Sequence, residues 1–309
     1  MSDVATAAGV EQLEGYRREL TAYCYRMLAS PFEAEDAVQE TMVRAWKSLD
    51  RFEGRSALRS WLYRIATNVC LDLLSGRERR ARPMDLGPAR EPVAENLHTP
   101  DVPWLQPLPD PADEVVERET IKLAFVAALQ HLPPKQRAAL ILCEVLRWRA
   151  SEAAELLETT VASVNSALQR ARATLESVDR PSSTPDEVDP ELLARYVAAF
   201  EAYDIEALTA LIQEDAIQSM PPFDLWLRGR DDIFTWWFGP GIGCKGSRVV
   251  PTVAANGSPA FGQYKPADGG GYEPWALQVL ELEGGTIREL TFFLDTETLF
   301  PLFGLPPRL

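Results

Sequence analysis

Short hydrogen-bonding side chains and arginines recur at helical spacing around residue 165. Ala154 suits the point where two helices touch, and Val161, Val164 and Leu168 suit the inward face of the second helix, which is the spacing of a helix-turn-helix. The outward face then carries groups that can hydrogen-bond to base edges and phosphates in a major groove: Thr160, Ser163, Asn165, Ser166, Gln169, Arg170 and Arg172. A plain helical hairpin is the alternative, and Glu158 stands in the turn where Gly is usual. The pattern favours binding of duplex DNA.

Cations and aromatic rings alternate in an earlier stretch. From Arg44 to Arg82 there are ten basic residues and four acidic ones. The interleaved side chains are Arg51, Phe52, Arg55, Arg59, Trp61, Tyr63, Arg64 and Asn68. Because guanidinium groups hold phosphates and exposed rings stack on bases, this mixture suits single-stranded DNA. The alternative is a solvated basic face over buried rings, and Trp61 in particular fits a core position.

A third set of side chains, three of them polar, precedes that stretch. Asp36, Gln39, Glu40 and Val43 stand side by side at helical spacing. Acidic residues near a helix start complement the helix dipole, which explains them without any partner. They could equally present a docking face to another protein.

Apolar stripes predict the helices that would carry these groups. The expected inward faces are Tyr16, Leu20, Tyr23, Met27 and Leu28, then Val38, Met42, Ala45, Trp46 and Leu49, then Leu58, Trp61, Leu62, Ile65, Val69 and Leu73. Further helices are expected over 113–131 and from Lys135. A small three-helix bundle followed by a second helical segment results.

Proline and charge divide the chain. Eight prolines between Pro83 and Pro111 exclude a regular helix and predict an extended linker, and residues 179–190 form a second break. Basic and acidic side chains number 13 and 12 in residues 1–82, 1 and 8 in 83–117, 9 and 7 in 118–180, and 8 and 19 in 181–309. The net charge of −15 argues against nucleic acid on its face. It lies in the linker and the last third, where it can compete with DNA for basic surfaces on the same chain.

Composition excludes several other classes. A chain of 309 residues is too long for one ordinary domain. The four cysteines are scattered without a C-x-x-C pair and there are only two histidines, so zinc sites and histidine triads are not supported. No apolar stretch is long enough to span a membrane, and the first residues do not form a signal peptide. We expect a cytoplasmic protein with no metal and no cofactor.

The two helical segments resemble the extracytoplasmic-function (ECF) sigma factors of bacterial RNA polymerase, members of the sigma-70 family. Glu35–Trp46 resembles the part of region two that docks on the clamp helices of the polymerase β′ subunit. Phe52–Leu74 resembles the part that opens and reads the −10 element, and His131–Arg172 resembles region four, which reads the −35 element. Both sets occur in the correct order, joined by a linker of suitable length.

The resemblance implies a role for each set. The residues implied to bind core polymerase are Asp36, Gln39, Glu40 and Val43; those implied at the −10 strand are Phe52, Arg55, Ser56, Arg59, Arg64, Asn68 and Asp72; those implied at the −35 groove are Thr160, Ser163, Asn165, Gln169, Arg170 and Arg172. The linker, including Trp104–Asp110, would run through the RNA-exit region of the polymerase.

The last third has a different pattern. Amphipathic helices are expected around Leu192–Phe200 and Ile205–Ile212, a strand over Glu214–Met220, and a helix over Asp231–Phe238. Four further strands are expected over Ser247–Ala255, Ala260–Tyr264, Glu273–Glu283 and Thr286–Leu294, separated by glycine-containing turns. With Ser219–Pro222, Trp226–Gly229 and Phe292–Asp295, this segment resembles a SnoaL-like domain, the cone-shaped fold of polyketide cyclases.

That fold implies a deep apolar pocket. The candidate lining residues are Trp226, Phe234, Trp236, Trp237, Phe261, Trp275 and Phe293. A carboxylate base for cyclase-like chemistry could come from Asp215, Asp231, Asp232 or Asp295. The alternative is that the aromatic rings form the core and the acids are solvated.

These observations predict a multidomain protein. A region two bundle over 1–82, an acidic proline-rich linker over 83–112 and a region four helix-turn-helix over 113–180 would be followed over 190–309 by an α+β cone with a curved antiparallel sheet. The expected function is that of an ECF sigma factor, not an enzyme, which binds the β′ clamp helices and β subunit of core polymerase and promoter DNA, with no membrane partner. Contact between the SnoaL-like domain and the sigma regions would control it in cis. The alternatives are a helix-turn-helix regulator with a ligand-binding domain and a cyclase with a DNA-binding appendage.

Overall fold

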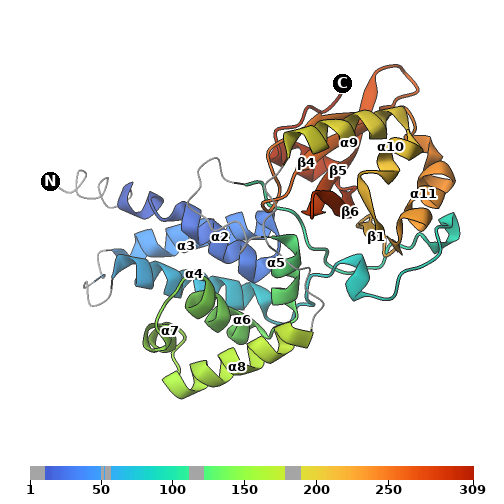
Figure 1. Ribbon diagram of the computed structural model, residues 1–309. Coiled ribbons are helices and arrows are strands. Elements are labelled where there is room, and N and C mark those ends of the chain that lie inside the picture. Colours follow the sequence, from blue (N-terminus) through green and yellow to red (C-terminus); the bar gives the residue numbers. More distant parts are fainter. Residues whose placement is uncertain (1–10, 50–51, 53–56, 111–121, 178–188) are drawn as a thin grey trace. The chain divides into compact units, whose positions relative to one another are not determined.

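The computed structural model describes residues 11–49, 52, 57–110, 122–177 and 189–309. These residues form two compact units, and each is described by itself (Figure 1). The helical unit contains the described residues from 11 to 80 with 105–108 and 122–177. The mixed unit contains 81–104, 109–110 and 189–309.

The first part of the helical unit is a three-helix bundle. Helices α2 (Arg17–Leu28), α3 (Pro31–Ser48) and α4 (Leu58–Leu74) pack against one another. The predicted stripe of α2 is buried, with Leu20, Tyr23 and Met27 fully enclosed. Helix α3 begins at a proline because its fixed φ suits the first turn, and the Ser30 hydroxyl accepts from the Glu33 N–H at 3.4 Å.

The second part of the helical unit contains the predicted helix-turn-helix. Its helices are α5 (Leu123–Gln130), α6 (Pro134–Leu140) with the π-helical turn η5 (Ile141–Val145), α7 (Ala150–Leu156) and α8 (Val161–Ser177). Ala154, Val164 and Leu168 are buried where α7 and α8 meet, as predicted, and Glu158 takes φ 52° in the turn between them. The inward placement of Val161 was wrong. It is the first residue of α8 and is 45% exposed.

The two parts are joined by a buried guanidinium. Arg137 of α6 is 2% exposed and donates to the Met27 carbonyl oxygen at the end of α2, to Gln130 Oε1 at 2.6 Å and to the backbone oxygens of Gln130 and Leu132 at 3.2 Å. The last carbonyls of a helix have no partner within it, and a cation there also complements the dipole. Burial lowers the pKa of Arg137 to about 10, so it stays charged at neutral pH.

The mixed unit is a helix-covered sheet. Its helices are α9 (Pro190–Ala202), α10 (Ile205–Thr209), α11 (Arg230–Phe238), the 3-10 turn η6 (Pro240–Cys244) and α12 (Thr296–Leu302); its strands are β1 (Ile212–Ser219), β2 (Trp226–Arg228), β3 (Arg248–Pro251), β4 (Ala260–Pro266), β5 (Tyr272–Glu283) and β6 (Thr286–Phe293). The strand order is β2-β1-β6-β5-β4-β3. All pairs of neighbouring strands are antiparallel except β1 with β6, which are parallel. After β2 the chain forms β3, β4 and β5, and only then returns as β6 beside β1.

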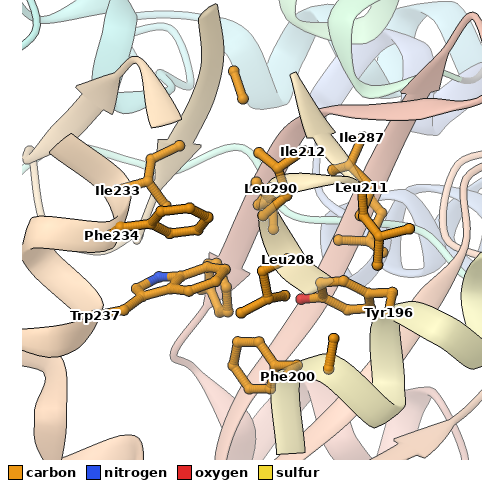
Figure 2. Packing of buried hydrophobic residues seen from close by; sticks show 14 of the residues in the cluster. Tyr196, Phe200, Leu208, Leu211, Ile212, Ile233, Phe234, Trp237, Ile287 and Leu290 are labelled. Carbon is orange, nitrogen blue, oxygen red and sulfur yellow. The ribbon is translucent and has the colours of Figure 1, made fainter. Parts of the chain in front are cut away.

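Helices α9, α10 and α11 contribute to the apolar core against this sheet (Figure 2). Tyr196 and Phe200 of α9 pack in one cluster with Phe234 and Trp237 of α11 and with Leu290 of β6. Phe200 and Trp237 meet edge to face with ring centroids 5.3 Å apart. The structure thus has the α+β architecture that the sequence predicts.

Some elements were missed or misplaced. The three-residue β2 and the helix α12 were not predicted, because neither is long enough for its periodicity to register. The strand expected over Ser247–Ala255 ends at Pro251. In the linker, single 3-10 turns form at Pro83–Asp85 (η2) and Ala94–Asn96 (η3); proline is compatible with the start of such a turn.

Replacing Arg137 tests the connection between the two helical parts. We expect Arg137→Ala to lower the free energy of unfolding of the helical unit by about 3 kcal/mol, because it leaves several buried carbonyl oxygens without a donor. Urea unfolding followed by circular dichroism measures this. Lys135→Ala, which removes an exposed cation from the same helix, should change it by less than about 0.5 kcal/mol. Equal effects of the two substitutions would contradict the structural role of Arg137.

Candidate nucleic-acid interface

The outward face of α3 carries the predicted protein-docking residues. Asp36, Gln39, Glu40 and Val43 are all exposed, and Glu40 forms an ion pair with Arg44 at 2.6 Å. Trp46, expected inward, is 54% exposed and is a correction. Its position lies three residues beyond Val43 and seven beyond Gln39, so the ring lies on the same exposed face of α3 and not in the core.

Helix α4 carries most of the predicted single-strand-binding set. Arg55 and Ser56 lie outside the described residues. Asn68 and Asp72 are exposed one turn apart, and Phe52 packs on Trp61 with ring centroids 5.0 Å apart. Trp61 is half-buried, between the core and the stacking alternatives.

The arginines of α4 are engaged within the helical unit. Arg59 forms an ion pair with Glu19 at 2.9 Å, and its guanidinium carbon lies 5.2 Å from the Tyr63 ring centroid and 5.6 Å from that of Trp148. Arg64 forms an ion pair with Glu155 of α7 at 3.4 Å. Tyr63 is fully buried, and burial together with the nearby Glu19 carboxylate raises the pKa of its hydroxyl. Tyr63 is therefore a structural ring and not an exposed stacking surface.

The predicted major-groove residues share the outer surface of the helix-turn-helix. Thr160, Ser163, Asn165, Gln169, Arg170 and Arg172 are all exposed. The Thr160 hydroxyl oxygen accepts from the Ser163 N–H at 3.1 Å, which makes Thr160 the N-cap of α8. Glu144 forms an ion pair with Arg172, and its hydrogen bond raises the pKa of that guanidinium. An N-capped helix with a polar outer face is the geometry that reads base edges in a major groove.

The aromatic residues proposed for the pocket of the mixed unit are mostly enclosed. Trp226, Phe234, Trp236, Trp237, Phe261 and Phe293 are buried, and Trp275 is half-buried. Phe234, Trp236, Trp237 and Phe261 belong to the apolar cluster, while the Trp226 indole donates to the Gly87 carbonyl oxygen at 2.8 Å. These four rings act as core.

The buried polar groups of this unit are neutral amides and hydroxyls that sequence reasoning missed. Tyr196 donates to Gln278 at 2.9 Å, Gln278 donates to Gln263 at 2.9 Å, and Gln263 donates to Ser247 at 3.1 Å. The Trp237 indole donates to Gln218 at 2.6 Å. The sequence signal for these buried groups is glutamine at inward-facing positions of otherwise apolar strands. The proposed bases Asp215, Asp231 and Asp295 are exposed and Asp232 is half-buried, so none of the four is enclosed with this chain of amides.

The linker is held along the mixed unit. Arg90 forms an ion pair with Asp224 at 2.9 Å, and the Arg90 N–H donates to the Trp226 carbonyl oxygen at 3.2 Å. The Asp224 N–H donates to the His98 carbonyl oxygen at 2.9 Å, and Leu97 packs against the apolar cluster. The linker is therefore not free over 87–98, which its proline content alone did not predict.

Three family models match the chain in succession. Sigma-70 region 2 matches residues 13–80, Sigma-70 region 4 matches 122–175 and a SnoaL-like domain matches 193–290. Helices α2–α4 and α5–α8 are thus regions two and four, and the mixed unit contains the SnoaL-like domain. This succession defines the class as a sigma factor with a SnoaL-like extension.

Known proteins narrow the class to a family. The chain is 47% identical over 312 residues to the ECF RNA polymerase sigma factor SigG of Mycobacterium tuberculosis, covering 96% of this chain and 83% of that protein. The ECF sigma factor SigJ of the same organism is 29% identical over 207 residues, 67% of this chain and 62% of SigJ. The crystal structure of SigJ has the same fold, with a TM-score of 0.64 at 20% identity over 96% of this chain and 100% of that chain. The chain belongs to the ECF sigma factors.

No helix in the described part of the chain is long and apolar enough to cross a membrane. No cluster of histidine, cysteine and carboxylate side chains there could hold a metal ion.

The Arg90–Asp224 pair makes the hold on the linker testable. We expect Asp224→Asn to speed tryptic cleavage after Arg90 about fivefold, because loss of a partly exposed ion pair worth about 1 kcal/mol raises the population in which the linker is open. Mass spectrometry of the fragments measures the rate. Asp231→Asn, at an exposed carboxylate of α11, is the matched control. Identical rates for Asp224→Asn and wild type would rule out this pair as the fastening.

Proposed function

We propose that this ECF sigma factor uses three faces of its sigma regions for three separate contacts during initiation. The α3 face with Asp36, Gln39, Glu40 and Val43 docks on the β′ clamp helices of core polymerase, and region four also contacts the β subunit. The α4 face with Arg59, Arg64, Asn68 and Asp72 binds the −10 strand, joined by Phe52, Arg55 and Ser56. The outer face of α8 reads the −35 element.

The observation that carries this proposal is the common exposure of the α8 residues. Short hydrogen-bonding side chains and arginines on one solvent-facing helix surface are what a major groove selects, because they reach both base edges and phosphates. The capped start of α8 at Thr160 orients its first turn. The polymerase contact is supported by the exposure of the α3 residues, because a docking surface must be accessible to its partner.

We propose further that the SnoaL-like domain regulates transcription in cis and does not catalyse a reaction. Its acidity supports this, since residues 181–309 carry 19 acidic and 8 basic side chains and a negative domain competes with DNA for basic surfaces. The exposed or half-buried state of Asp215, Asp231, Asp232 and Asp295, beside a core of neutral amides, gives no support to a carboxylate base in the domain. The protein works in the cytoplasm, where core polymerase and promoter DNA are found.

Run-off transcription with core polymerase tests the DNA contacts. Promoters are first selected from a randomised library with the wild-type chain. On a selected promoter we expect Arg170→Ala to reduce initiation about tenfold, because a base or phosphate contact by arginine is worth about 1–3 kcal/mol. Arg195→Ala, an exposed arginine of α9, is the charge-matched control. Transcripts that do not depend on the chain, or equal activity of the two variants, would contradict the proposal.

A truncation tests control in cis. Residues 1–180 should initiate more often than the full chain on the same promoter, because the acidic domain no longer competes for the basic surfaces. A thermal melt of the truncated protein shows whether it is folded, and the full chain is assayed at equal concentration. If the folded truncation is equally or less active, the domain does not inhibit.

A further inference from the structure

The face of region two that we propose for the −10 strand is covered at Arg59 and Arg64 by a segment of region four. This covering segment runs from Trp148 to Glu155, from the turn before α7 to the end of that helix. Both regions belong to the helical unit, in which α4 packs against α6 and α7. The covering segment is thus a neighbour of α4 within one compact unit.

Two side chains of the covering segment engage α4 directly. The Trp148 ring lies 5.2 Å from the Tyr63 ring between centroids, and the Arg59 guanidinium faces it at 5.6 Å. Glu155 accepts from Arg64 at 3.4 Å through its carboxylate, and its backbone oxygen also accepts from Arg64 at 3.4 Å. Arg59 and Arg64 are the two α4 arginines proposed to hold the −10 strand, and each is engaged by one of these residues.

The chemistry of this contact matches that of a nucleotide. A carboxylate satisfies an arginine as a phosphate does, through a charge-assisted hydrogen bond. An indole offers a flat π-surface to a guanidinium as a base does. Trp148 and Glu155 together therefore present one ring and one anion, which are the two groups that a single-stranded nucleotide would bring to the same arginines.

The contact is also built to open. The Trp148 indole N–H and the Arg64 Nε are buried without a hydrogen-bond partner in the described part of the chain. An unpaired buried donor lowers the net stability of the contact that encloses it. The Arg64–Glu155 pair is partly solvated, with side chains 36% and 72% exposed, so water screens it.

We propose that the covering segment occupies the −10-binding face in the free chain as a nucleotide mimic and must leave before promoter DNA binds. This inference rests on the proposed −10 contacts of α4 and adds an inhibitor inside the sigma regions themselves. The covering segment contacts Arg59, Tyr63 and Arg64 of α4. It requires no contribution from the SnoaL-like domain.

The distance between two spin labels in the full chain shows whether region four lies against region two, and it can be measured without polymerase or promoter DNA. Nitroxides are placed at Lys47→Cys on α3 and Ala173→Cys on α8, both exposed, after Cys143→Ser and Cys244→Ser. Cys24 and Cys70 are buried, so we expect the label not to reach them. Pulsed electron paramagnetic resonance should give one narrow distribution of label-to-label distances when the covering segment is unsubstituted. Trp148→Ala and Glu155→Gln should each broaden it or add a longer component. Glu176→Gln makes the same charge change on α8 and should leave it narrow.

DNA binding by the same proteins measures the masking. The probe is a short fluorescein-labelled thymidine homopolymer, followed by anisotropy. We expect Trp148→Ala and Glu155→Gln to tighten binding about three- to tenfold relative to Glu176→Gln, because apparent affinity follows the fraction of molecules with the face uncovered. Glu155 is exposed, so its substitution keeps the test valid if Trp148→Ala does not fold.

Unchanged distance distributions for Glu155→Gln and for folded Trp148→Ala overturn the proposal. So does a longer distance without tighter DNA binding, or tighter binding without a longer distance. Failure of the proposed function is separate, because it appears as run-off transcription that does not depend on the wild-type chain. If the chain is active as a sigma factor but the label-to-label distance does not change in the variants, only the proposed role of the covering segment is wrong.

Discussion

The carboxyl end of α2 is the constraint on which the helical unit depends. The last carbonyl oxygens of a helix lack partners in the helix itself, and three carbonyl oxygens at this end are met from distant parts of the chain. Gln130 donates to the Arg26 oxygen at 3.4 Å, Arg137 donates to the Met27 oxygen, and the Gln106 N–H donates to the Ala29 oxygen at 3.1 Å. Region four and a short stretch of the linker are thereby fixed to one helix end.

This fixation has a consequence for promoter recognition. Once Arg137 holds α6 against α2, the turn that follows α6 reaches α4, and Trp148 comes to rest on Tyr63. The interaction that makes the helical unit stable therefore also brings region four onto the basic face of region two. In the mechanism that we propose, promoter reading requires both regions to be available to DNA at once, so the stability of the free unit opposes activity.

Sequence reasoning succeeded where a local pattern determines structure. The helix-turn-helix, the buried faces of α2 and α8 and the strands β4–β6 follow from periodicity, and family resemblance supplied their meaning. It failed where the outcome depends on distant partners. Trp46 sits at the edge of its apolar stripe, and only the packing of the bundle decides that it faces solvent. Nothing within the sequence near Arg137, Trp148 or Asp224 indicates partners in α2, in α4 or at Arg90.

We propose that the free chain holds regions two and four together and that core polymerase must separate them. The direct test is the distance between labels on α3 and α8 in a chain whose covering segment is unsubstituted. This distance is measured for the free chain and for the chain bound to core polymerase. A short, narrow distribution in the free chain that is replaced by a longer one in the complex is the predicted result. The same distribution in both states would contradict the account.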